Sequence, residues 1–390
     1  MSISNLPLSY CTNVHPARTL AEVEQALDRY TVKIAERFGK PLAAGLWLPR
    51  SVVKELIYTT EGVSRLREGL GLAGRGLSCH TLNAFPFGDF HSPRVKENVY
   101  LPDWSHGDRL SYTQDCATIL AHLLPKGGEG SISTLPLGFK GAKNSTDFLD
   151  DCAQALLVTA TFLHRLHTSK KKMIRLAVEP EPLCVLETTA ETIEFFGRLH
   201  EIAKRQGKLD IVRDHVGVCY DVCHQAVEFE DVAQSIRDLE AAGIRINKVH
   251  ISAAIELKNP AGNAEGRTEL LRYVEPRYLH QTFAKTAAGK IVHETDLNES
   301  LISNPSPDFA GAEAWRVHFH VPIDAENLGP LATTRPELIK ALKEVGKLNY
   351  APHLEVETYT WQVLPGAGPM DLVEGLAREL KSADRLVRAD

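Results

Sequence analysis

Ionisable side chains stand at the ends of several apolar segments of this sequence. Glu179 follows Leu-Ala-Val, Asp221 ends the run 216–221, His250 lies in Val-His-Ile-Ser, and Glu357 ends the run 353–357. A buried carboxylate is costly unless it is paired or binds a metal, so a cation shared by all four residues is the economical explanation. A mixed set of carboxylate and imidazole ligands suits Zn or Mn, with Mg, Co or Fe as further candidates.

Other polar residues follow the same pattern and extend the candidate set. His80 precedes Thr-Leu-Asn, and His318 and His320 share one face of the predicted strand 316–321, because side chains alternate along a strand. Glu355 shares a face with Glu357 and is expected to lie deeper, where it either joins the site or pairs with an interior cation. We treat these four residues as additional metal or substrate ligands: His80, His318, His320 and Glu355.

The elements that must position these residues alternate along the chain. Predicted helices, such as 19–38, 188–206 and 232–242, separate short apolar strands. This order predicts parallel strands joined by crossovers. No glycine-rich phosphate turn follows the first strand, which argues against a dinucleotide-binding sheet, so we predict a single (β/α)8 barrel over residues 1–390. The candidate strands are 7–13, 43–48, 77–83, 131–137, 174–179, 216–221, 246–252, 316–321 and 353–358.

A barrel holds eight strands, which leaves one candidate too many. The interval between the strands 246–252 and 353–358 is long and contains the runs 277–283 and 290–296 around a glycine-containing turn. We predict an inserted β-hairpin there, within an insertion spanning 255–315. Tyr278, His280 and His293 could make it a lid over the barrel mouth. The segment 316–321 then belongs to this insertion or returns beside the mouth.

Composition excludes several functional classes. The 390 residues carry a net charge of −6, which makes nucleic acid an unexpected partner. The seven cysteines are scattered without a CxxC pair, as expected of thiols in a reducing compartment. No signal peptide or transmembrane run is evident, so we expect a cytoplasmic protein that does not insert into a membrane.

The order Glu, Asp-x-x-His, His and Glu-Thr-Tyr at successive strand ends resembles the xylose isomerase-like barrels. That superfamily includes sugar and sugar-phosphate isomerases and epimerases, and zinc-dependent endonucleases of the endonuclease IV type. The resemblance implies that Glu179, Asp221, His250 and Glu357 hold a divalent ion. It also implies that Glu179 and Glu357 move a proton, and that His224 contacts the substrate.

Longer phrases resemble the EboE family of metabolite traffic proteins, which are encoded in bacterial gene clusters. They cover most of the chain and include TLNAFPFGDFH, STLPLGF, VEPEPLCVLETT, DVCHQAVEFED, EPRYLHQT, RVHFHVP and HLEVETYTW. This resemblance implies a role in processing or moving a secondary-metabolite precursor, with functional partners encoded in the same cluster.

Three functional hypotheses follow. The first is a metal-dependent isomerase or epimerase that acts on a polyhydroxylated, sugar-like carbonyl compound, with Glu179, Glu357 and His224 as catalytic residues. The second is a zinc-dependent phosphodiesterase or related hydrolase of the endonuclease IV type. The third is a non-catalytic metabolite carrier, or a partner of a membrane transport system. Converging carboxylates favour the enzymes, because a scaffold has no need of them.

Overall fold

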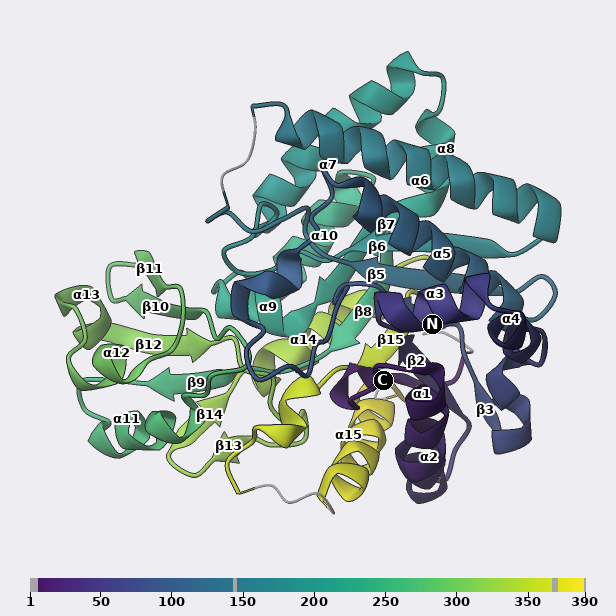
Figure 1. Ribbon diagram of the computed structural model, residues 1–390. Coiled ribbons are helices and arrows are strands. Elements are labelled where there is room, and N and C mark those ends of the chain that lie inside the picture. Colours follow the sequence, from purple (N-terminus) through teal and green to yellow (C-terminus); the bar gives the residue numbers. More distant parts are fainter. Residues whose placement is uncertain (1–5, 143–145, 367–370, 389–390) are drawn as a thin grey trace.

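Eight parallel strands form a closed barrel in the computed structural model, which describes residues 6–142, 146–366 and 371–388 (Figure 1). β1 pairs with both β2 and β15, and this closes the ring. The predicted barrel is therefore confirmed. Its strands, in chain order, are β1 (Ser9–Cys11), β2 (Leu42–Trp47), β4 (Thr81–Asn83), β5 (Glu129–Thr134), β6 (Met173–Val178), β7 (Val216–Asp221), β8 (Ile246–Ile251) and β15 (His353–Val356).

The predicted strand 77–83 is divided in the structure. β3 (Leu77–Ser78) pairs with β2 outside the ring, and β4 takes the place within it. The ring strands are almost wholly buried, as expected of parallel strands that are covered on both faces. Gly45 in β2 allows one close approach, because a Cβ at this position would overlap the carboxylate of Glu355. A strand glycine at such a contact is a packing requirement.

Helices surround the barrel and begin where capping residues allow. Thr19 and Thr188 each form a reciprocal capping box, with Glu22 and Glu191 respectively. The predicted helix 188–206 corresponds closely to α7. The main helices are α1 (Leu20–Ala26), α2 (Val32–Phe38), α3 (Arg50–Tyr58), α4 (Thr60–Arg67), α5 (Gly107–Leu123), α6 (Phe148–Lys170), α7 (Thr189–Arg205), α8 (Leu209–His215), α9 (Val222–Val227), α10 (Val232–Ala241), α14 (Arg335–Val345) and α15 (Asp371–Arg388).

A second, antiparallel sheet lies beside the barrel, on the left of Figure 1. Its order is β11-β10-β12-β9-β14-β13, and the short helices α11 (Ala264–Leu270), α12 (Glu299–Ser303) and α13 (Pro307–Ala310) accompany it. β10 and β11 form the predicted hairpin, although its first strand begins at Thr282 and not at residue 277. The strands are β9 (Ile255–Lys258), β10 (Thr282–Thr286), β11 (Ile291–Glu294), β12 (Ala312–Val317), β13 (Asn327–Leu328) and β14 (Leu331–Thr333).

The predicted strand 316–321 is wrong in its bounds. β12 ends at Val317, and residues 318–321 continue without regular structure, although they stay buried. The strand begins earlier than predicted, at Ala312, and Trp315 and Val317 are its alternating buried side chains. The pair His318 and His320 therefore stands on a segment that leaves the second sheet.

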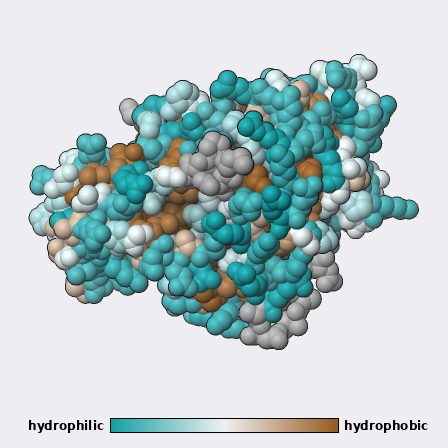
Figure 2. All heavy atoms as spheres, turned by 90° about the horizontal axis from the view of Figure 1, so that it is seen from below, coloured by the Kyte–Doolittle hydropathy of each residue, from teal (hydrophilic) through white to brown (hydrophobic). Residues whose placement is uncertain are grey.

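The surface seen in Figure 2 is largely hydrophilic and carries separate hydrophobic patches. Scattered apolar side chains on a surface are ordinary. Within the described ranges, we find no helix with the length and apolar content that a membrane span requires.

Candidate metal centre

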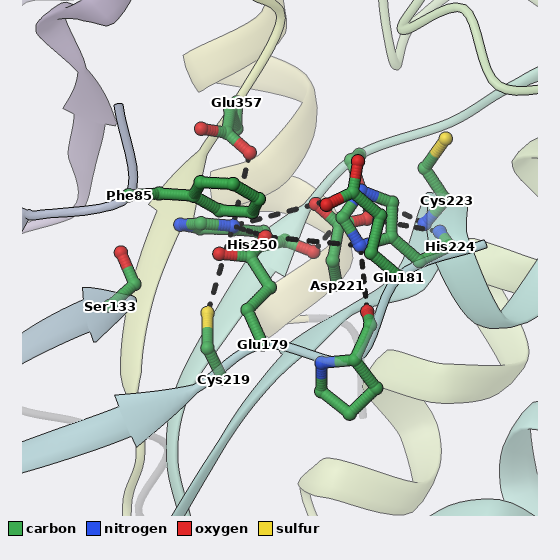
Figure 3. Close-up of polar contacts among 12 residues, drawn as sticks. Phe85, Ser133, Glu179, Glu181, Cys219, Asp221, Cys223, His224, His250 and Glu357 are labelled. Atoms are coloured by element: carbon green, nitrogen blue, oxygen red, sulfur yellow. Dashed lines mark hydrogen bonds and ion pairs between the residues drawn. The ribbon is translucent and has the colours of Figure 1, made fainter. Parts of the chain in front are cut away.

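The four predicted ligands meet at the carboxyl ends of four neighbouring strands. β6, β7, β8 and β15 are consecutive in the ring, and they position Glu179, Asp221, His250 and Glu357. Nδ1 of His250 lies 2.8 Å from Glu179 Oε1, 3.0 Å from Glu357 Oε2 and 3.4 Å from Asp221 Oδ2 (Figure 3). All four side chains are buried. The loops at this end of a TIM barrel share one mouth, and this is where the active sites of TIM-barrel enzymes lie.

Neighbouring side chains fix the orientation of these groups. Asn13 and Asn83 each donate from Nδ2 to Glu357 Oε1, at 2.9 and 3.1 Å, and this leaves Oε2 facing His250. Ser252 donates to Asp221 Oδ1 at 2.6 Å. On the other side of the His250 ring, Nε2 lies 3.3 Å from Glu355 Oε1. Contacts of this kind orient metal ligands in proteins and tune their affinity.

Burial and charge push the pKa values of these groups in different directions. Burial raises the pKa of Glu179 to about 7, although His250 opposes that rise. Burial would also raise the pKa of Glu357, but the charge and hydrogen bond of His250, together with the charge of His320, outweigh it and lower that pKa. For Asp221, the charges of His224 and His320 outweigh burial and hold its pKa well below the usual range. Burial opposes protonation of His250, yet Cys219, Glu179 and Glu357 raise its pKa well above the ordinary value.

The donor atoms fit a divalent cation. Glu179 Oε2 and Asp221 Oδ2 are buried and have no hydrogen-bond partner among the described residues. One suitably placed ligand atom from each of Glu179, Asp221, His250 and Glu357 lies within 4.8 Å of the other three. Three carboxylates around one imidazole are an unfavourable arrangement without a cation, and their N and O donors suit a first-row ion.

A cavity that is partly open to solvent lies against this cluster. Its lining includes Glu179 and Glu357 together with a group of aromatic rings. Phe90, Tyr278 and Tyr359 contact one another with ring centroids 4.9–5.5 Å apart. The cavity thus combines ionisable groups with an aromatic wall that comes from three distant parts of the chain.

Comparison with solved structures supports this description of the fold. The chain is similar to a xylose isomerase-like TIM barrel protein from Mycobacterium smegmatis, determined in complex with magnesium. The TM-score is 0.54 at 10% identity, over 99% of this chain and 100% of that one. The fold is that of a xylose isomerase-like TIM barrel.

Weaker similarities are found to a D-tagatose 3-epimerase-like protein and to the IOLI protein with a bound zinc atom. Their TM-scores are 0.49 and 0.48 at 13% and 12% identity, and each match covers 98% of both chains. No family model matches the sequence, and no curated protein matches it either.

Three further histidines reach the mouth of this xylose isomerase-like barrel. His224, which the sequence suggested as a catalytic residue, lies in the first turn of α9, three residues after Asp221, and lines the cavity. His318 lines the cavity as well, and Nε2 of His320 lies 3.9 Å from Asp221 Oδ2. The additional candidates His318 and His320 therefore do converge on the site, although from a loop and not from a strand.

The other two additional candidates lie elsewhere. Glu355 is fully buried, and its Oε1 lies 2.6 Å from Nζ of Lys248. It therefore pairs with a cationic side chain in the barrel interior, which was one of the two alternatives that the sequence left open. His80 precedes β4 and therefore lies at the amino end of that strand, the end opposite the metal centre. Its ring contacts that of His353, the first residue of β15, at 4.8 Å. The structure does not bring His80 to the metal centre.

Several residues of the site were missed by sequence reasoning. Glu181 follows Glu179 in the segment Glu-Pro-Glu-Pro and lines the cavity, and burial raises its pKa well above the ordinary value. Its Oε1 accepts a hydrogen bond of 2.8 Å from Tyr100. Cys219 Sγ lies 3.6 Å from His250 Nδ1. The proline-rich loop has no periodicity that would reveal Glu181, but Cys219 is two residues before Asp221 and so shares its strand face.

The three residues that the sequence suggested for a lid do not all face the cavity. Tyr278 lines the cavity and contacts the Phe90 and Tyr359 rings. His280 is buried and turned away, with Nε2 2.7 Å from Glu275 Oε1. His293 lies on β11, where its ring contacts Phe283 at 5.4 Å. Only Tyr278 of these three faces the proposed substrate space among the described residues.

Proposed function

We propose that this protein is a divalent-metal-dependent isomerase or epimerase that acts on a sugar-like carbonyl compound. One observation carries the proposal. Glu179 and Glu357 come from the outer two of four neighbouring strands, and both line the cavity while approaching His250 Nδ1. Two carboxylates that approach a shared space from opposite sides can remove a proton from one face of a carbon and return one to the other.

Residues of this chain would both bind the cation and exchange the proton. Glu179, Asp221, His250 and Glu357 would hold the cation, which as a Lewis acid would increase the acidity of a C–H bond beside a carbonyl. Glu179 and Glu357 would exchange the proton with that carbon. Asn13 and Asn83 keep one oxygen of Glu357 occupied, so Oε2 is the oxygen available for this exchange.

The lining of the cavity supports a small polyhydroxylated substrate. Glu181 and His318 offer polar atoms near the cluster, whereas Phe90 and Tyr359 offer apolar faces. A sugar presents hydroxyl groups on its edges and C–H groups on its faces, so it matches both kinds of wall. Pockets of this type, apolar with a few convergent polar groups, are typical of small-molecule sites.

The insertion would act as the wall that shields this chemistry from water. Tyr278 and Leu279, from the segment before β10, line the cavity. We propose that residues 255–315 form a lid on a chain that is otherwise one barrel domain.

We further propose membership of the EboE family and a role with a secondary-metabolite precursor. Six of the seven sequence phrases that suggest this family carry site residues. TLNAFPFGDFH contains Asn83, DVCHQAVEFED contains Asp221 and His224, and EPRYLHQT contains Tyr278. VEPEPLCVLETT contains Glu179 and Glu181, RVHFHVP contains His318 and His320, and HLEVETYTW contains Glu357. The phrases that suggest the family are thus also phrases that build the cavity.

Proton exchange tests the proposed reaction directly. The metal-loaded protein is incubated in D2O with a panel of aldoses, ketoses and their oxidised derivatives, and NMR follows deuterium at the carbon beside the carbonyl. We expect incorporation for at least one compound, and its loss in Glu179→Gln and Glu357→Gln. The matched control Glu344→Gln, outside the cavity, should behave as the unmodified protein.

Two results would count against this function. The first is an absence of exchange with every compound of the panel. The second is exchange that survives both glutamine substitutions. Hydrolysis of bis(p-nitrophenyl) phosphate without any exchange would instead support the zinc-dependent hydrolase.

A further inference from the structure

The strand β11 forms one edge of the second sheet, and its outer side has no partner strand in the described chain. The sheet order begins with β11, which pairs with β10 alone. Figure 1 shows β11 at the upper left, on the side of the sheet that lies away from β9. Three of its four residues, Ile291, His293 and Glu294, are exposed. An open edge of this kind can pair with a further strand.

The register of the neighbouring strands shows which backbone groups point outward. Thr286 N–H donates to Lys290 O at 2.9 Å, so the even-numbered residues of β10 and β11 bond to each other. Gln281 O accepts a bond from the residue that follows β12, so the odd-numbered residues of β10 bond to that strand. Because bonding directions alternate along an antiparallel strand, the N–H and C=O groups of Ile291 and His293 face the open edge.

The sequence of β11 complements itself when two copies pair antiparallel. A pairing centred on Val292 places Ile291 opposite the partner's His293, and Lys290 opposite the partner's Glu294. Both outward-facing residues of each copy then belong to hydrogen-bonded pairs. Lys290 and Glu294 occupy non-hydrogen-bonded pairs, where opposed side chains lie closest. Opposite charges that face each other across such a pair are favourable.

Charge and register together favour a second copy as the occupant of this edge. Edge strands commonly avoid pairing by carrying lysine or proline. β11 has no proline, and the lysine before it is balanced by a glutamate at the same distance from the centre. A centre shifted to Ile291 or His293 would leave one outward-facing residue without a partner within β11. Lys290 also pairs with Asp308, but these side chains are 62% and 48% exposed, so that ion pair is weak and can exchange.

We propose that two copies of this chain associate through β11 into one continuous antiparallel sheet across a two-fold axis. The same surface is used on both copies, as in other two-fold symmetric dimers. Val292 meets the partner's Val292 at the axis, and an ion pair closes each end. The interface contains none of the four ligands of the metal centre, so this inference goes beyond the proposed function and does not depend on it.

Charge reversal tests the pairing and its register. Sedimentation velocity follows the mass of the unmodified protein, which should rise from one chain to two as the concentration increases. Lys290→Glu should weaken this association about tenfold, because two pairs of carboxylates then face each other. The double variant Lys290→Glu, Glu294→Lys restores opposite charges and should recover the dimer. Lys343→Glu, which makes the same change at an exposed position of α14, is the control.

Proline at the edge distinguishes backbone pairing from contact between side chains. The N–H group of His293 points away from β10, so His293→Pro removes a donor to the partner and none within the sheet. We expect this variant to remain monomeric at concentrations where the unmodified protein is a dimer. Circular dichroism and thermal unfolding check that its fold is kept.

A disulfide reports the register directly and detects a weak association as well. In the proposed dimer the Cα atoms of the two copies of Val292 are about 4.5 Å apart, within the range of about 4.4–6.8 Å that a disulfide spans. The described cysteines are all buried, so they should not interfere. Oxidation should link Val292→Cys into dimers much faster than Ile291→Cys, whose two thiols would be displaced along the strands.

Two results would overturn this interface. The first is equal oxidation of the two cysteine variants, which would leave the edge to a strand of another protein. The second is a dimer that neither His293→Pro nor Lys290→Glu weakens, because another surface must then form it. Either result leaves the proposed function intact, since the deuterium exchange experiment tests that function separately.

Discussion

Lys248 and Glu355 form a fully buried ion pair in the barrel interior, with Nζ and Oε1 2.6 Å apart. Nζ also donates to Ser133 at 3.1 Å, and Glu355 Oε1 lies 3.3 Å from His250 Nε2. The pair thus supports the inner side of the imidazole whose Nδ1 faces the metal centre. Although burial alone would raise the pKa of Glu355, Lys248 lowers it to about 2. Glu355 therefore stays ionised under the histidine.

Removing the cation of this pair should destabilise the protein strongly. Lys248→Met leaves Glu355 buried and unpaired, for which the expected loss is about 3–5 kcal/mol in the free energy of unfolding. The double variant Lys248→Met, Glu355→Leu should recover much of that loss, because no isolated charge remains. Chemical denaturation of the metal-free proteins measures both values. A single variant as stable as the unmodified protein would show that the ion pair is not needed.

Asn13 and Asn83 should determine the metal affinity without being ligands. Both donate to Glu357 Oε1, so Asn13→Leu and Asn83→Leu release the carboxylate from its fixed orientation. Loss of such a contact typically weakens metal binding about 10- to 100-fold. Calorimetric titration with zinc measures this change. Gln206→Leu, which removes only an exposed contact with Gln154, is the control. Equal affinity in all the variants would contradict a supporting role.

The four-ligand cluster could be predicted because each member follows an apolar run that can be recognised in the sequence. Parallel strands that alternate with helices bring their carboxyl ends together, so Glu179, Asp221, His250 and Glu357 had to converge once the barrel was inferred. In a closed barrel of eight strands the last strand in chain order lies between the seventh and the first, and β15 takes this place between β8 and β1. The sequence could not show how close the four side chains lie to one another.

The second sheet was largely hidden from sequence reasoning. β13 and β14 have only two and three residues, too few for a readable alternation of side chains. β9 begins four residues after β8 ends, so the two read as one segment. His80 illustrates a different difficulty. Whether it lies at the mouth or at the base of the barrel depends on which side of β4 it occupies, and composition does not reveal that.

His80 should make the metal-free protein less stable in acid. Burial lowers the pKa of His80 to about 4, below the value of about 6.5 in an unfolded chain. As the pH falls from 6.5, the unfolded chain binds the proton first, so stability is complete above pH 6.5 and is lost between 6.5 and 4. At pH 4 the free energy of unfolding is lower by about 3 kcal/mol than it is above pH 6.5. His80→Leu should reduce the slope of stability against pH in this range, as measured by denaturant unfolding with a chelator present.

A control and a second readout separate this effect from metal binding. His293→Gln replaces an exposed histidine and should leave the slope unchanged. His80→Leu should also keep the zinc content of the unmodified protein, because His80 is remote from the metal centre. A lower zinc content in this variant would indicate that His80 is a metal ligand.

Lys96 should control how firmly the proposed lid is held. Its side chain is buried, and Nζ donates to Tyr278 O at 2.6 Å and Glu275 O at 3.1 Å, and lies 2.6 Å from Asp296 Oδ2. Lys96→Met removes these three contacts, each of which involves a charged group. Hydrogen bonds to charged groups contribute about 1.5–3 kcal/mol each. Loss of the equivalent of one such bond corresponds to opening that is about 10- to 100-fold more frequent, so we expect amide hydrogen exchange of residues 275–284 to become at least that much faster, as measured by mass spectrometry.

The matched control for this prediction is Lys290→Met. Lys290 forms a comparable ion pair with Asp308 in the same insertion, but both side chains are largely exposed, so the pair should contribute little. Exchange in residues 275–284 should be unchanged in this variant. If both variants exchange at the rate of the unmodified protein, Lys96 does not hold the segment. The lid would then depend on the aromatic contacts of Tyr278 with Phe90 and Tyr359.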